Sequence, residues 1–181
     1  ARRVSQGLIL HTGAGPTVIG YGNEPERVAA DRLAAILTKA GFPAAATGDV
    51  DRSIWPKVAV NAAINGLTAV AGVTNGELQS STSLFEASEA LADEAAAVAS
   101  AHGYDLFAIQ HTLRETIDAT AKNRSSMLQD VDAGRRTEVD AIYGSLLTAG
   151  RARGLALPAL TVIDALVRSV SGHDGDRKEP K

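Results

Sequence analysis

A long helix is predicted by the stretch Trp55–Leu78, WPKVAVNAAINGLTAVAGVTNGEL, and the rest of the chain is organised around it. Apolar residues recur nearly all the way round this helix, which is typical of a helix buried in a core. One polar stripe interrupts them, made by Lys57, Asn61 and Asn65 and followed by Thr68. Because four residues advance a helix by about 400°, these three side chains lie within roughly 80° of one another.

Two interpretations of this polar stripe are open from spacing alone. A solvated face is the common explanation for polar residues on a helix. Such faces are usually built from long charged residues, whereas asparagine forms helices poorly because its amide competes for backbone hydrogen bonds. A lysine beside two amides also suits a helix that points at a small polar ligand.

The composition favours a helix-rich globular chain. Of its 181 residues 45% are apolar and 4% aromatic, which suffices for one substantial domain or one and a half small ones. The net charge of −3, without a basic patch, argues against a nucleic-acid or membrane partner. The absence of cysteine excludes disulfides and thiol chemistry and fits a reducing cytoplasm. No apolar run approaches the roughly 18 residues of a membrane span, and we expect no leader peptide and a cytoplasmic protein.

The first 47 residues predict a small α/β piece. Two short β-like runs, Leu8–His11 and Thr17–Tyr21, suggest an adjacent antiparallel pair. A helix follows over Glu24–Ala40, and Phe42–Thr47 suits one more strand. The helix is expected to bury Val28, Leu33, Ile36 and Leu37. Gly15 belongs to no phosphate loop, because a strand follows it and the pattern GxGxxG is absent from the chain.

Residues 54–171 predict about five helices joined by short loops, an all-α bundle. The long helix is expected to begin near Asp51 or Ser53, with Pro56 in its first turn. The last helix, Pro158–Val170, is expected to bury Leu160, Ile163, Leu166 and Val167.

Several other side chains are candidates for chemistry beside the stripe. Lysine can act as a general acid toward a carbonyl oxygen, and an amide both donates and accepts hydrogen bonds. Glu138 is the carboxylate most plausibly in the same cleft, although a first-turn glutamate that favours the helix dipole is the simpler interpretation. Ser126, with capping-box spacing to Gln129, is equally explained as a helix cap. The four histidines lack ligand spacing, so no metal site is predicted.

Four motifs in order resemble one known family. They are Lys57-x3-Asn61-x3-Asn65-Gly-Leu-Thr68, Asn75-Gly-Glu-Leu78, Asn123-x2-Ser126-Met-Leu-Gln-Asp130 and Arg136-Thr-Glu138-Val-Asp140-x3-Gly144. Together they are similar to the C-terminal domain of ketopantoate reductase (2-dehydropantoate 2-reductase). The resemblance implies a remnant of an NADP-binding Rossmann domain over residues 1–50 and a helical substrate-binding domain over residues 51–171. That domain would be an all-helical bundle of the 6-phosphogluconate dehydrogenase C-terminal type, followed by a disordered tail over residues 172–181.

The resemblance also implies a reaction, the NADPH-dependent reduction of 2-dehydropantoate to (R)-pantoate on the route to pantothenate and coenzyme A. Lys57 would protonate the C2 oxygen of the substrate. Glu138 would contact the nicotinamide-ribose side of the cofactor and orient the lysine. Substrate binding would fall to Asn61 and Asn65 at the polar end, with Asn75 close by, and to Ser126 at the carboxylate. The site asparagine matched by Asn123 receives no specified role.

This chain departs from the family pattern in two respects. Gly66 stands where the family often has proline, which we expect to loosen the helix locally. The sequence also lacks the GxGxxG loop and most of the cofactor site, so we expect this chain alone to be inactive. Two alternatives stay open: a reductase of another 2-oxo acid, and a truncated paralogue serving as a helical dimerisation or binding module. Alanine-rich helix faces suit a homodimer through the helical domain and an intrachain core equally well.

Overall fold

The computed structural model describes residues 2–10 and 15–172. The expected tail therefore lies outside the described residues, except for Gly172, and so do His11 and His173. The chain forms two compact units, Ala1–Ile54 and Trp55–Lys181. No helix in the described part of the chain is long and apolar enough to cross a membrane.

The first unit contains a βαβ arrangement. Strand β3 (Thr17–Gly20) pairs in parallel with β4 (Ala44–Thr47), and the intervening helix α1 (Glu24–Lys39) makes the crossover. A separate antiparallel pair joins β1 (Arg2–Ser5) and β2 (Leu8–Leu10). The predicted antiparallel pairing of the second and third strands is therefore wrong. β2 pairs with β1 instead, and β3 pairs with β4, which runs parallel to it because a crossover helix separates the two strands.

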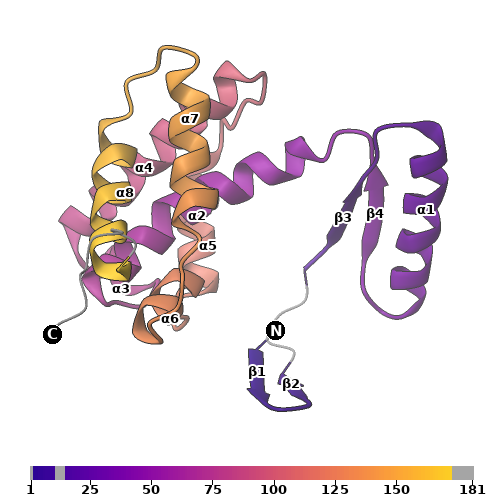
Figure 1. Ribbon diagram of the computed structural model, residues 1–181, viewed down its shortest axis with the longest axis horizontal. Helices are drawn as coiled ribbons and strands as arrows, with labels where there is room; N and C mark the ends of the chain where they lie inside the picture. Colours follow the sequence, from indigo (N-terminus) through magenta and orange to yellow (C-terminus); the bar gives the residue numbers. More distant parts are fainter. Residues whose placement is uncertain (1, 11–14, 173–181) are drawn as a thin grey trace, which may run out of the picture. The chain divides into compact units, whose positions relative to one another are not determined.

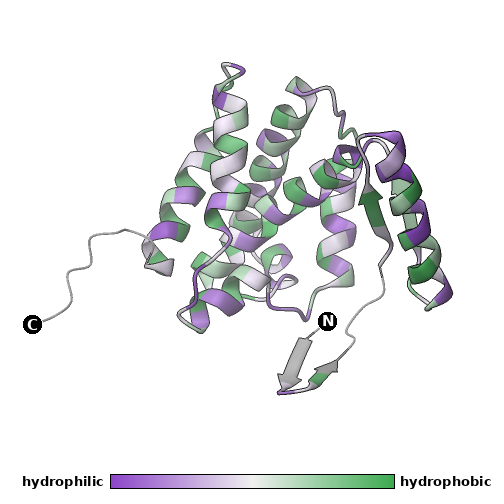
Figure 2. Cartoon of the chain, turned by 45° about the vertical axis from the view of Figure 1, so that its right-hand side comes forward, coloured by the Kyte–Doolittle hydropathy of each residue, from purple (hydrophilic) through white to green (hydrophobic). Residues whose placement is uncertain are grey.

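Helix α1 begins as its sequence indicates, since the Asn23 side chain accepts a hydrogen bond from the Glu26 N–H at 3.0 Å. The residues that α1 buries are the small Ala30 and Ala34. Three of the larger residues expected inside are exposed: Val28, Leu33 and Ile36. Hydrophilic and hydrophobic bands alternate along α1 in Figure 2. Two strands, one of them built from alanines, cover only a narrow part of a helix face, so the larger apolar residues stay outside.

The second unit is the helical bundle seen in Figure 1. Its elements are α2 (Asp51–Ala71, which begins before the unit boundary), α3 (Glu77–Ser80), α4 (Thr82–Ala101), α5 (Ile109–Ala119), α6 (Ser126–Asp132), the π-helical turn η1 (Asp140–Gly144), α7 (Ser145–Arg151) and α8 (Pro158–Ser171). The predicted mainly helical chain with a small α/β part is confirmed.

The core of the bundle forms around the later turns of α2. That helix buries small residues, Ala59, Ala62 and Ala63 among them, so neighbouring helices pack close to it. Two details of the predictions are wrong. Pro56 lies in the second turn, because α2 begins at Asp51. Leu166 is 43% exposed, since it lies on the outer side of α8, whereas Leu160, Ile163 and Val167 are buried as expected.

Candidate functional site

The polar stripe of α2 runs from the surface into the bundle. Lys57 is exposed, Asn61 is half-buried, and Asn65 is only 7% exposed. No hydrogen bond or ion pair joins any of these three side chains to another described residue. Buried amides normally have a hydrogen-bond partner, so Asn65 needs one from water or a ligand. The Asn65 amide is not among the fully buried polar atoms of the described residues, so water or a ligand can reach it at the inner end of the stripe.

Ser126 and Glu138 lie together on the bundle surface. The Ser126 hydroxyl donates to Glu138 Oε2 at 3.4 Å, and both residues are exposed. The helix cap is the neighbouring Ser125, whose Oγ accepts from the Leu128 N–H at 3.1 Å. The capping alternative for Ser126 is therefore wrong. Its hydroxyl and the Glu138 carboxylate are both available to a ligand.

A second hydrogen bond ties this pair to the stripe helix. The hydroxyls of Thr68 and Ser125 lie 2.7 Å apart, and both residues are buried. Thr68 Oγ1 also lies 3.0 Å from the backbone carbonyls of Ile64 and Asn65. The N-terminus of α6, which carries Ser126, is thus fixed against the turn of α2 that carries Asn65.

The segment after Glu138 contains a feature that the sequence did not predict. Instead of a regular helix, Asp140–Gly144 forms a π-turn in which the Ser145 N–H bonds back to the Asp140 carbonyl. This turn places the buried Tyr143 against α2. The Tyr143 hydroxyl donates to the Ala62 carbonyl at 2.8 Å and accepts from the Gly66 N–H at 2.9 Å. Burial raises the pKa of Tyr143 above its usual range, so the hydroxyl stays protonated.

Gly66 is required for this contact. A Cβ at Gly66 would lie 2.3 Å from the Tyr143 hydroxyl and 2.8 Å from Ile163 Cγ1. The missing side chain thus admits a tight packing contact, and the expected loosening of the helix at Gly66 stays a prediction. A glycine inside an otherwise apolar helix was the sequence signal for such an approach.

Asn75 occupies a different environment from the stripe. Its Nδ2 donates to Thr120 Oγ1 at 2.9 Å, and its backbone N–H donates to the Asn123 carbonyl at 3.0 Å. The residue is 8% exposed, and its Oδ1 has no hydrogen-bond partner. These contacts join the loop after α2 to the loop before α6. A substrate contact by Asn75 remains a prediction.

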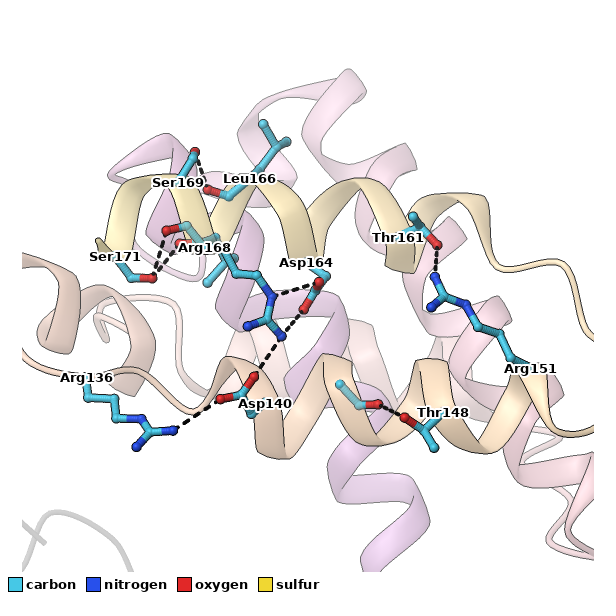
Figure 3. A network of polar contacts seen from close by, with 12 residues as sticks. Arg136, Asp140, Thr148, Arg151, Thr161, Asp164, Leu166, Arg168, Ser169 and Ser171 are labelled. Atoms are coloured by element: carbon cyan, nitrogen blue, oxygen red, sulfur yellow. Dashed lines mark hydrogen bonds and ion pairs between the residues drawn. The ribbon is translucent and has the colours of Figure 1, made fainter. Parts of the chain in front are cut away.

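An ion-pair network holds the π-turn against α8 (Figure 3). Arg168 Nη2 lies 2.8 Å from Asp140 Oδ1, and the same guanidinium binds Asp164 through two hydrogen bonds of 3.0 Å. Arg136 approaches the other Asp140 oxygen at 3.3 Å. The hydrogen bonds from Arg168 and then Arg136 lower the pKa of Asp140. This network anchors the turn that follows Glu138.

The predicted contact between Lys57 and Glu138 is not found in the structure. Among the described residues no hydrogen bond or ion pair joins the two, so the orienting role of Glu138 remains a prediction. No cluster of three or more His, Asp or Glu side chains that could hold a metal ion occurs in the described ranges.

A cavity of about 310 Å³, which the sequence did not predict, lies beside Pro56. Its other lining residues are 105–109 and Thr112.

The family model for the C-terminal domain of ketopantoate reductase (PanE/ApbA) matches residues 49–171 of this chain. The chain belongs to the ketopantoate reductase family. This span contains all of the residues that the sequence singled out for substrate or catalysis, from Lys57 to Glu138.

Relatives and solved structures agree with the family. The 2-dehydropantoate 2-reductase of Archaeoglobus fulgidus is 38% identical over 164 residues, covering 91% of this chain and 55% of that protein. The structure of 2-dehydropantoate 2-reductase from Methylococcus capsulatus superposes with a TM-score of 0.80 at 30% identity, covering 96% of this chain and 61% of that one. A D-mandelate dehydrogenase with NADH and anilino(oxo)acetate gives a TM-score of 0.82 at 25% identity, covering 89% and 68%. The chain thus spans somewhat more than half the length of these ketopantoate reductases.

Proposed function

We propose that this chain supplies the substrate-binding and catalytic-lysine domain of an NADPH-dependent 2-dehydropantoate reductase. The observation that carries the proposal is the stripe on α2, an exposed lysine followed by two asparagines of increasing burial that have no hydrogen-bond partner among the described residues. Membership of the ketopantoate reductase family supports the substrate class. The reaction would serve the route to pantothenate and coenzyme A.

The residues would divide the substrate between them. The Ser126 hydroxyl would hold the carboxylate of the 2-oxo acid, because a hydroxyl donates well to an anionic oxygen. Asn61 and Asn65 would bind the polar end of ketopantoate, the hydroxyl at C4, to which an amide can both donate and accept. Lys57 would give its proton to the C2 oxygen as negative charge develops there.

A nicotinamide cofactor would supply the hydride. The residues present fit its ribose end, since the exposed Glu138 carboxylate can accept hydrogen bonds from ribose hydroxyls. The GxGxxG pattern that binds the pyrophosphate is absent from this sequence. We therefore propose that the 181-residue chain alone does not oxidise NADPH.

A related function uses the same arrangement on another 2-oxo acid. The similarity to a D-mandelate dehydrogenase bound to NADH supports this alternative, because mandelate is an aromatic 2-hydroxy acid. The side chains described above would recognise a carboxylate and a carbonyl in either case. Only the contacts of Asn61 and Asn65 would favour a substrate with a hydroxyl at C4.

The test is an NMR titration of the ¹⁵N-labelled chain. Ketopantoate should shift the amide signals around Asn61, Asn65 and Ser126, whereas acetate at the same concentration should shift only those around Ser126. Phenylglyoxylate, the 2-oxo acid corresponding to mandelate, tests the alternative function. If phenylglyoxylate binds more strongly than ketopantoate, the alternative function is favoured. Absence of signal shifts with all three ligands would overturn the proposed site.

A further inference from the structure

We propose that Tyr143 is a positioning residue, which sets the direction of the stripe amides by inserting its hydroxyl between two backbone groups of α2. The inference rests on the proposed function, because it assigns Tyr143 a role in recognising the C4 hydroxyl of ketopantoate. Nothing in the four sequence motifs singled out this tyrosine.

The Tyr143 hydroxyl bonds two backbone groups of α2. In a regular α-helix the Gly66 N–H would donate to the Ala62 carbonyl, four residues earlier. The Tyr143 hydroxyl bonds both groups, at 2.9 Å and 2.8 Å. The hydroxyl therefore shares these two backbone groups within a helix that stays unbroken over Asp51–Ala71. The affected turn begins directly after Asn61 and ends directly after Asn65.

The peptide unit between Asn65 and Gly66 is bonded on both sides. Its N–H is bonded to Tyr143, and its carbonyl lies 3.0 Å from Thr68 Oγ1. Both edges of this peptide plane are therefore fixed by side chains. Because the plane begins at the α-carbon of Asn65, its orientation limits the directions available to the Asn65 amide.

A series of hydrogen bonds links this turn of α2 to Ser126 and Glu138. Thr68 is bonded to Ser125, the cap residue before Ser126, and Ser126 is bonded to Glu138. Glu138 leads through the π-turn back to Tyr143. These contacts close a ring that joins the proposed carboxylate contact to the proposed hydroxyl contact.

A purely structural role for Tyr143 makes a different prediction from a positioning role. A loss of packing would weaken the binding of every ligand alike. A change in the direction of Asn61 and Asn65 would weaken only ligands that use those amides. The suitable pair is ketopantoate and 3,3-dimethyl-2-oxobutanoate, which is ketopantoate without its C4 hydroxyl.

The experiment compares the dissociation constants of both ligands for the wild-type chain, Tyr143→Phe and a control, Ser88→Ala. Phenylalanine keeps the ring and removes the hydroxyl. Ser88 is a matched control because its buried hydroxyl also donates to a carbonyl of α2, that of Ala63 at 3.0 Å, without joining a second backbone group. Tyr143→Phe should weaken ketopantoate binding by roughly 3- to 10-fold, the equivalent of about one hydrogen bond, and leave the analogue unchanged.

The outcomes separate the two proposals. A wild-type chain that does not prefer ketopantoate to the analogue overturns the proposed recognition, and the role of Tyr143 with it. A wild-type preference that Tyr143→Phe leaves intact, or an equal loss with Ser88→Ala, overturns the positioning role alone. If Tyr143→Phe fails to fold, the positioning role is tested on the wild-type chain, by NMR titration with both ligands. Ketopantoate, but not the analogue, should then shift the Gly66 amide and the shielded Tyr143 hydroxyl proton.

Discussion

The hydroxyls of Thr68 and Ser125 lie 2.7 Å apart although 57 residues separate them in sequence. Ser125 also caps α6 by accepting from the Leu128 N–H. Ser125 therefore caps the N-terminus of α6 and also joins that helix to α2 at Thr68, directly after the polar stripe. The proposed carboxylate contact at Ser126 depends on both functions.

Replacing this cap should destabilise the bundle. We expect Ser125→Ala to lower the free energy of unfolding by about 1–2 kcal/mol, because it removes the cap of α6 and the hydrogen bond to Thr68. Urea denaturation followed by circular dichroism measures the change. Thr68→Val is the companion variant, and the double variant should cost less than the sum of the two single changes. Strict additivity would show that the two hydroxyls do not interact.

Gly66 should tolerate no side chain. Gly66→Ala places a Cβ 2.3 Å from the Tyr143 hydroxyl, so we expect a loss of about 1–3 kcal/mol or more in unfolding free energy. The matched control is Gly144→Ala, since a Cβ there would have no neighbour closer than 3.9 Å. That change should be neutral or stabilise by up to about 1 kcal/mol, as expected for alanine in a helix. Equal effects of the two substitutions would argue against the contact.

The proposed carboxylate contact can be tested without disturbing the fold. Ser126→Ala should weaken ketopantoate binding by about 10-fold, the effect of losing a hydrogen bond to a charged group. Because Ser126 is exposed, the free energy of unfolding of the variant should differ from that of the wild type by less than about 0.5 kcal/mol. Calorimetric titration gives the affinity, with Ser83→Ala, an exposed serine near the start of α4, as the control. Unchanged affinity in Ser126→Ala would remove this residue from the site.

Acid should weaken the attachment of the π-turn to α8. The pKa of Asp140 is lowered in the folded protein by Arg168 and Arg136, so folding favours its charged form. That contribution is present above the unfolded pKa of about 4 and is lost as the pH falls through the lower folded pKa. The urea midpoint of the wild type should therefore drop more between about pH 5.5 and about pH 3 than that of Asp140→Asn. An identical drop in both proteins would show that Asp140 does not contribute.

Much of the architecture followed from local patterns. The helical spacing around Lys57, Asn61 and Asn65 predicted both the central helix and its polar face. Pairing was less predictable, because short strands such as Thr17–Gly20 carry little information about their partner. The wrong assignments of Leu33 and Leu166 have a similar cause. Periodicity identifies an apolar face, but what covers that face depends on distant segments.

The sequence by itself determined that a lysine and two amides share one side of a buried helix, since helical geometry requires only their spacing. It also determined the family, through motifs whose order and separation are readable without coordinates. Tertiary structure decided which side-chain hydroxyls bond to the backbone and which remain accessible to a ligand. Ser125 rather than Ser126 caps its helix, and Tyr143 enters the backbone of α2 beside a glycine. The bonds of Ser125 to Thr68 and of Tyr143 to Gly66 join residues 57 and 77 positions apart, and no local preference specifies such pairs.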